Sequence, residues 1–115
     1  MSEKTTAFVK ELVARFPGLA SLLDAHRQNN ADEILPHVFF GDVTRYVVVL
    51  ADKSAGSELR DIITYLEEAF AGRVGEISNL ISVSFLENLP REDERAARIR
   101  ALLGPLLSAE SQAIG

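Results

Sequence analysis

The sequence predicts an all-α fold, a single compact bundle of five or six helices joined by short loops. Apolar residues recur three and four positions apart along most of the 115 residues, which is the spacing of amphipathic helices. The interval between Gly75 and Pro90 holds fourteen residues without Gly or Pro, which suits a helix, since strands usually run about 5–6 residues. The hydrophobic fraction of 47% is enough to build a core without disulfides.

Two helices are predicted within the first thirty residues. The segment from Glu3 to Phe16 has its apolar side chains at helical spacing, and it ends there because the residue before Pro17 avoids the helical region. Pro17 can itself be the first residue of the next helix, because that position needs no N–H donor. The apolar face of this second helix consists of Leu19, Leu22, Leu23 and His26.

The middle of the chain predicts two further helices separated by a loop. Asn30 followed by Glu33 resembles a capping box, and a longer helix is expected to start at Pro36. Residues 53–57 read KSAGS, a loop in which Ser57 is a good N-cap for the helix that follows. The apolar stripe of that helix consists of Leu59, Ile62, Ile63, Leu66 and Phe70.

The stretch LISVSFLENL at 80–89 has two interpretations. Its apolar residues alternate with Ser82 and Ser84, which is the period of a strand, and together with the β-branched run RYVVVL it would give an α/β fold with a β-α-β unit at 45–86. That unit has only two strands, and a two-stranded sheet is marginal by itself. We therefore favour a central helix, in which Ser84 and Asn88 fall on an apolar face and need buried hydrogen-bond partners.

A last helix is predicted after Pro90. The run REDERAARIRALL carries its acids in the first turn and its later arginines toward the other end, as the helix dipole favours. Gly104 and Pro105 end or kink this helix. We expect residues 108–115 to form a frayed tail, and residues 1–115 to form a single helical domain.

Composition and motifs exclude several kinds of chemistry. The absence of Cys removes thiol chemistry and fits a reducing compartment, so we expect a cytoplasmic location. No apolar run approaches the ~20 residues that a membrane span needs. Nucleotide-binding glycine loops and hydrolase motifs are missing, and two histidines without Cys are too few for a zinc site. We therefore expect no metal, no cofactor and no enzymatic activity, with Glu87 as the one unusually placed carboxylate.

The negative charge is concentrated in the middle of the chain. Between Asp52 and Arg95 there are ten acids and five bases, so this segment carries the whole net charge of -5. Nucleic acid is a poor partner for such a surface, because phosphate binding needs a basic stripe. A basic protein would be steered toward it. Solubility alone also explains an acidic balance, and this interpretation stays open.

Four blocks of sequence, EILPHVFFGDVTRY, YLEEAF, NLISVSFLENL and LLGPLL, resemble a family of small, uncharacterised bacterial helical proteins. The resemblance covers Glu33 to Leu107, and its motifs contain no catalytic pattern. Such proteins are similar to immunity proteins from polymorphic-toxin and contact-inhibition loci. The resemblance therefore implies a helical fold and a role in binding a protein toxin, although one fold serves many functions.

Two hypotheses for function follow. The first is a non-enzymatic cytoplasmic protein-binding domain of the immunity type, which neutralises a cognate bacterial toxin through an acidic surface. The second is a helical adaptor or regulatory subunit that binds a peptide or helix in an apolar groove. For the first hypothesis the predicted partner-binding residues are Glu67, Glu68, Glu76, Glu92, Asp93 and Glu94.

Overall fold

The computed structural model describes residues 3–53 and 56–114. This part of the chain contains seven α-helices and no strand. The all-α prediction is confirmed, with slightly more helices than the predicted five or six. The helices are α1 (Glu3–Arg15), α2 (Ala20–Asn29), α3 (Pro36–Asp52), α4 (Gly56–Ala71), α5 (Gly75–Ile81), α6 (Glu94–Leu102) and α7 (Pro105–Ile114). Two shorter pieces are η1 (Pro17–Leu19), a 3-10 turn that leads into α2, and η2 (Ser82–Leu86), a π-helical turn that continues α5.

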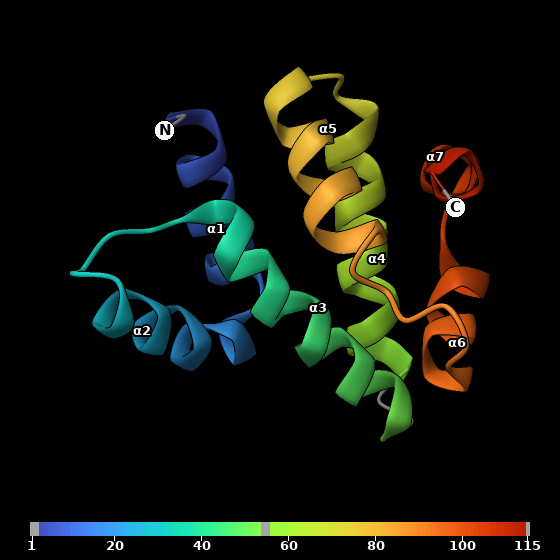
Figure 1. Cartoon of the computed structure of the whole chain (residues 1–115), viewed down its shortest axis with the longest axis horizontal. Helices are drawn as coiled ribbons and strands as arrows, with labels where there is room; N and C mark the ends of the chain where they lie inside the picture. Colours follow the sequence, from blue (N-terminus) through green and yellow to red (C-terminus); the bar gives the residue numbers. More distant parts are fainter. Residues whose placement is uncertain (1–2, 54–55, 115) are drawn as a thin grey trace.

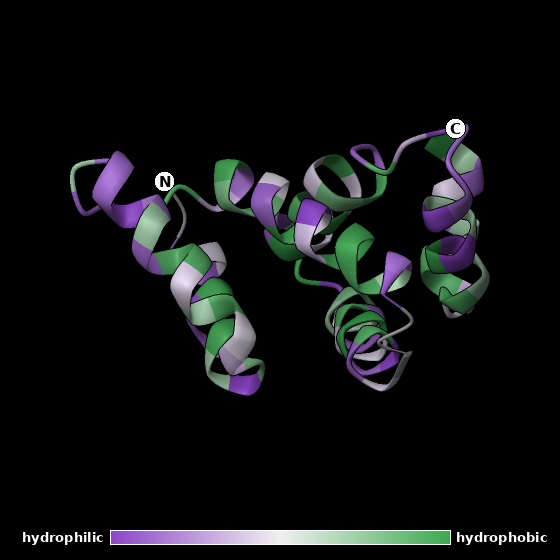
Figure 2. Ribbon diagram, turned by 90° about the horizontal axis from the view of Figure 1, so that it is seen from below, coloured by the Kyte–Doolittle hydropathy of each residue, from purple (hydrophilic) through white to green (hydrophobic). Residues whose placement is uncertain are grey.

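The helices α4 and α5 lie side by side in the middle of the molecule (Figure 1). In that view α1 and α2 lie on one side of this pair, α6 and α7 lie on the other, and α3 crosses from the first group toward the lower end of α4. Hydrophobic and hydrophilic residues alternate along the helices, as expected of amphipathic helices that share a core (Figure 2). The radius of gyration is 13.3 Å, close to the ~13 Å of a compact chain of this length.

Proline residues begin three of the helical elements. Pro17 is the first residue of η1, Pro36 is the first residue of α3, and Pro105 is the first residue of α7. The first residue of a helix needs no N–H donor, and the proline ring already fixes its φ angle near the helical value. The predicted helix starts at Pro17 and Pro36 are therefore confirmed.

The connection between α2 and α3 is held by a buried histidine rather than by the predicted capping box. The Asn30 side chain turns back, and its Nδ2 donates to the carbonyl oxygen of His26 at 2.6 Å. His26 is only 3% exposed, and its Nε2 accepts a hydrogen bond from the backbone N–H of Leu35 at 2.9 Å. Ala31 and Asp32 have positive φ angles of 54° and 67°, so no helix starts at Asn30 and the capping-box prediction is wrong.

The helix α4 begins one residue before the predicted N-cap. Ser57 is the second residue of α4, which starts at Gly56, so the prediction of Ser57 as the N-cap is wrong. Residues 54–55 of the predicted loop lie outside the described residues. The first turn of α4 is tied to α3, because the Tyr46 hydroxyl donates to Glu58 Oε2 at 2.7 Å. Burial and this hydrogen bond to Glu58 raise the pKa of Tyr46 to about 12.

The predicted central helix is formed by α5 and η2. These two elements pack against α1, α3, α4 and α7, so neighbouring helices surround them on several sides. Half of their twelve residues are buried, and these lie from Leu80 onward. The fully or almost fully buried residues of this rod are Leu80, Ile81, Ser82, Ser84, Phe85 and Leu86.

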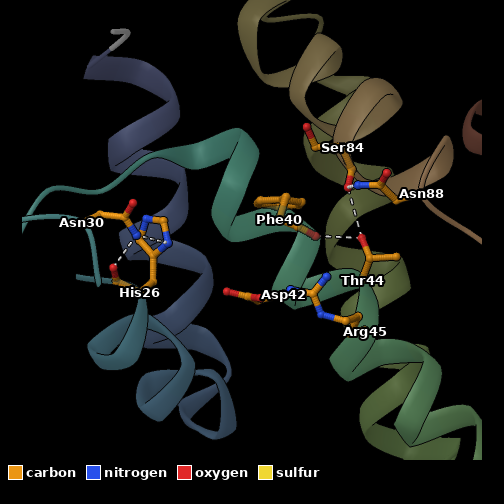
Figure 3. A network of polar contacts seen from close by, with 8 residues as sticks. All are labelled: His26, Asn30, Phe40, Asp42, Thr44, Arg45, Ser84 and Asn88. Atoms are coloured by element: carbon orange, nitrogen blue, oxygen red, sulfur yellow. Dashed lines mark hydrogen bonds and ion pairs between the residues drawn. The ribbon is translucent and has the colours of Figure 1, made fainter. Parts of the chain in front are cut away.

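The rod widens into a π-helical turn at its C-terminal end. The backbone N–H of Glu87 bonds the carbonyl oxygen of Ser82, five residues back, at 3.1 Å. The N–H of Asn88 then bonds the Phe85 oxygen, three residues back, so it does not reach the carbonyl oxygen of Ser84. That oxygen accepts a hydrogen bond from the Asn88 side chain at 2.8 Å (Figure 3). It also lies 3.1 Å from Thr44 Oγ1 of α3, whose single hydroxyl hydrogen is shared with the nearer Phe40 carbonyl oxygen at 2.7 Å.

The two serine hydroxyls of the π-helical turn face different neighbours. Ser82 Oγ donates to Glu110 Oε2 of α7 at 2.6 Å, and Ser84 Oγ lies 2.6 Å from Nδ1 of His37 on α3. Residues two apart point to different sides of a helix, so each serine finds its own partner. Ser84 is buried and hydrogen-bonded as expected, although its partner His37 is exposed. The prediction that Asn88 lies on the apolar face is wrong, because Asn88 is exposed and only its amide bonds the Ser84 oxygen.

The strand interpretation of the same stretch is wrong. Residues 80–89 contain no strand, and the run RYVVVL lies inside α3, so the alternative β-α-β unit at 45–86 does not form. Ser82 and Ser84 lie on different faces of the rod, and each has a hydrogen-bond partner on its own face. Serines can therefore alternate with apolar residues in a helix. β-branched residues in RYVVVL are helical because their burial against neighbouring helices outweighs a weak local preference for strands.

The C-terminal segment is helical up to Ile114. The helix α7 buries Leu107, and Glu110 bonds the rod, so residues expected to form a frayed tail are part of the packed structure. Fraying of the last turn of α7 in solution stays a prediction, and residue 115 lies outside the described residues.

We predict that removing the Thr44 hydroxyl weakens the packing of α3 on the rod. In Thr44→Val the Ser84 carbonyl oxygen loses its donor from α3 while the side-chain shape is kept, which should lower the free energy of unfolding by about 1–2 kcal/mol. Urea denaturation measures this change. The matched control is Thr64→Val at an exposed position of α4, which should change stability by less than about 0.5 kcal/mol. Equal losses in both variants would contradict the role of Thr44.

Candidate partner-binding site

The six acidic residues predicted to bind a partner lie in three separate places. Glu67 faces the start of α7, Glu68 and Glu76 lie at the end of the molecule where α4 meets α5, and residues 92–94 lie at the start of α6. The last two places are separated by the α5–η2 rod, whose twelve residues span on the order of 15–18 Å. The six residues therefore belong to three separate segments, α4, the start of α5 and the start of α6.

Glu67 stabilises the start of α7. Its two carboxylate oxygens accept hydrogen bonds from the backbone N–H groups of Leu106 and Leu107, at 2.9 and 3.0 Å. These N–H groups belong to the first turn of a helix, where they have no partner inside the helix. Gly104 allows this approach, because a Cβ at that position would collide with the Glu67 side chain. Glu67 is thus used inside the fold.

Asp93 is the N-cap of α6. Its Oδ1 accepts a hydrogen bond from the backbone N–H of Arg95 at 2.8 Å, and the guanidinium of Arg95 binds the same carboxylate. The hydrogen bonds from Arg95 lower the pKa of Asp93 to about 2. Its neighbours Glu92 and Glu94 are exposed. Glu92 and Glu94 are therefore the more exposed of the three acids in this segment.

Glu68 lies at the edge of a hollow between α1, α4 and α5. The volume of this hollow, which we call the α1–α4–α5 hollow, is about 290 Å³. Its lining consists of Phe8, Glu11, Tyr65, Glu68, Ala69 and Ile77. Glu76, also exposed, precedes Ile77 in the first turn of α5. Two of the six predicted residues therefore lie at or next to a hollow that three helices build.

Aromatic rings form one wall of this hollow. The rings of Phe8 and Tyr65 stack with centroids 6.0 Å apart, and Phe16 meets Tyr65 edge-on at 5.7 Å. Phe8 also stacks on the buried Phe40, which fixes the wall to the core. Burial and the nearby Glu11 carboxylate raise the pKa of Tyr65, and the positive charge of Arg15 partly opposes this.

This arrangement suits a positively charged side chain better than an anion. The exposed carboxylates of Glu11 and Glu68 can each accept charge-assisted hydrogen bonds from an ammonium or guanidinium group. The partly exposed ring of Tyr65 can attract the same cations, whereas Phe8 is buried between Phe40 and Tyr65. The negative charge of Glu11 already acts on Tyr65, so an incoming cation would meet both features at once.

Sequence reasoning missed Glu11, Tyr65 and Phe8. Each was assigned only to its own helix, because a single sequence does not say which helices are neighbours in space. Glu11 and Phe8 are three residues apart on α1, so they share a face, and that spacing was the available signal. The third helix, α5, had to be placed before the hollow could be recognised.

Comparison with known proteins places the chain in a family. A family model described as a domain of unknown function, DUF7674, matches residues 9–114. The chain belongs to the DUF7674 family. All the residues that line the α1–α4–α5 hollow except Phe8 fall inside the part of the chain that DUF7674 covers. No curated protein and no solved structure matches the chain.

The described part of this DUF7674 chain contains neither a metal-binding cluster nor a membrane-spanning helix. No group of three or more His, Asp or Glu side chains that could hold a metal ion occurs within residues 3–53 and 56–114. Over the same ranges, every helix is too short or too polar to cross a membrane. Glu87, the unusually placed carboxylate, is exposed and lines a different hollow beside Arg91.

We predict that Glu67 contributes to stability and that its neighbour does not. Glu67→Ala leaves the N–H groups of Leu106 and Leu107 without their acceptor, which should cost about 1–2 kcal/mol of the free energy of unfolding. Amide hydrogen exchange should also become faster in α7. The control is Glu68→Ala, at the adjacent exposed position, which should leave both quantities nearly unchanged. Equal effects of the two substitutions would show that Glu67 does not cap α7.

Proposed function

We propose that this chain is a non-enzymatic protein-binding domain that receives a basic side chain of its partner in the α1–α4–α5 hollow. The observation that carries this proposal is the pairing of two exposed carboxylates, Glu11 and Glu68, with the partly exposed ring of Tyr65, which stacks on the buried Phe8. Carboxylates beside aromatic faces are the groups that bind lysine and arginine side chains.

The chain already holds one guanidinium close to this wall. The Cζ atom of Arg15 lies 5.0 Å from the centroid of the Phe16 ring, and Phe16 in turn contacts Tyr65. Cation–aromatic contact is therefore part of the native packing next to the hollow. Arg15 also brings a positive charge near Tyr65, so it limits the negative potential of the hollow to the region of Glu11 and Glu68.

The net charge of the chain supports the same kind of partner. At -5, the protein attracts basic proteins over long range, and Glu76 adds to the negative charge beside the hollow. Within the protein-binding proposal we favour an immunity protein that acts in the bacterial cytoplasm and neutralises a basic toxin by covering its site. The resemblance of the sequence to bacterial immunity proteins and the negative net charge of the chain support that choice.

The test compares two variants with equal changes in charge. Glu11→Gln with Glu68→Gln removes two charges at the hollow, while Glu92→Gln with Glu94→Gln removes two exposed charges at the start of α6. The natural partner is captured from cells on immobilised wild-type chain and purified, and its association rate is measured with each variant. We predict that the hollow variant binds about tenfold more slowly at low salt, and that the difference shrinks at high salt.

The control variant should retain most of the wild-type rate at every salt concentration. Equal rates for wild type and the hollow variant would contradict the assignment of this site. Equal losses in the two double variants would show that only the total charge matters.

The immunity assignment has a separate test. The wild-type chain is co-expressed with the toxic product of a neighbouring gene, and cell growth is measured. Wild type and the Glu92→Gln/Glu94→Gln variant should restore growth, whereas the Glu11→Gln/Glu68→Gln variant should restore it less at equal protein levels. Failure of the wild type to restore growth, despite binding a partner through the hollow, would favour an adaptor over an immunity protein.

A further inference from the structure

A second and larger hollow lies at the other end of the α5–η2 rod. Its volume is about 410 Å³, within the range typical of sites for small molecules. The turn that follows η2, the helix α6 and the end of α7 form its walls. Apolar side chains on these walls are Leu86, Leu89 and Ile114, and the first two are almost fully buried. We call this the η2–α6–α7 hollow.

Two arginines give this hollow a positive edge in an acidic protein. Arg100 is half-buried, and its guanidinium donates to the carbonyl oxygens of Leu89 and Pro90 at 3.2 and 3.0 Å. Those two bonds fix the plane of the guanidinium. A guanidinium has five N–H groups, so others remain to donate to a ligand. Arg91 is exposed and has no hydrogen bond or ion pair to any other described residue.

Most polar side chains around this edge can donate hydrogen bonds. Ser111 and Gln112 of α7 also line the hollow, and each can donate a hydrogen bond. Glu87 is the one lining side chain that can only accept when ionised, and its charge is exceeded by the two arginines. The hollow therefore combines an apolar wall with a net positive, donor-rich edge, unlike the α1–α4–α5 hollow.

We propose that the η2–α6–α7 hollow binds a small organic carboxylate with an apolar body. The carboxylate receives charge-assisted hydrogen bonds from Arg91 and Arg100, and the apolar body packs on Leu86, Leu89 and Ile114. Charge complementarity selects this ligand, because an amine would meet two guanidinium groups at the edge. The site does not depend on partner binding at the other hollow.

The position of the hollow gives independent support. Leu86 is the last residue of the π-helical turn, and Glu87, which also lines the hollow, makes the hydrogen bond that closes the turn. The π-helical turn ends the rod, so the chain leaves the rod at the wall of the hollow. The wider turn and the tight bonds that follow it direct the chain toward α6, which leaves the carbonyl oxygens of Leu89 and Pro90 available to hold Arg100.

The test uses octanoate, octanamide and octylamine, three probes with similar apolar bodies and different head groups. Each is titrated into the full chain while methyl NMR signals of Leu86, Leu89 and Ile114 are followed. We expect saturable shifts with octanoate below about 10 mM, and binding weaker by about tenfold for octanamide and more for octylamine. Shifts confined to other methyl groups, or equal affinity for the three probes, would overturn the proposal.

A matched pair of variants tests the arginine edge. Arg91→Gln should weaken octanoate binding by about tenfold and leave octanamide binding nearly unchanged, because only the charged probe uses the guanidinium. The control is Arg60→Gln at an exposed position of α4 outside the hollow, which should affect neither probe. Unchanged octanoate affinity in Arg91→Gln, or equal losses in both variants, would show that the carboxylate does not bind at this edge.

Discussion

The contact between α3 and the central rod is built around one backbone oxygen, the carbonyl of Ser84 near the C-terminal end of the rod. The π-helical turn leaves this oxygen without the N–H of Asn88, and a buried carbonyl without a donor would be costly. The Asn88 amide supplies a donor at 2.8 Å, and the Thr44 hydroxyl of α3, whose hydrogen is shared with the Phe40 oxygen, supplies a longer contact at 3.1 Å. The same contact that satisfies the turn therefore joins α3 to the rod, and the partners of Ser82 and Ser84 extend this link to α7 and His37.

The two hollows lie at opposite ends of the α5–η2 rod. Ile77, in the first turn of the rod, lines the acidic and aromatic hollow, whereas Leu86, at its end, lines the donor-rich hollow. The two sites carry opposite charge preferences, so a basic side chain and an organic carboxylate would select different ends of the molecule. The rod is buried mainly over its second half, where Val83 is the exposed residue.

Much of the fold could be predicted from the sequence, because helix boundaries depend on local chemistry. Pro17 and Pro36 mark helix starts, and the Gly75 to Pro90 interval is too long for a strand. The errors arose where contacts between residues far apart in the sequence determine the local structure. His26 bonds the N–H of Leu35 and replaces the predicted capping box at Asn30. The turn at Ser84 contacts Thr44, forty positions away. The acidic candidates divided for the same reason, since Glu67 is used by α7 and Glu68 borders a hollow whose other walls come from α1 and α5.

The most direct test of this account measures scalar couplings across hydrogen bonds by NMR, between amide nitrogens and carbonyl carbons of residues 82–89. A coupling between the Glu87 nitrogen and the Ser82 carbonyl carbon is expected, together with none between the Asn88 nitrogen and the Ser84 carbonyl carbon. A coupling between Asn88 and Ser84 would mean that the rod is a regular α-helix there. In that case the Ser84 oxygen would not need Thr44, and the link between α3 and the rod would lose its physical basis.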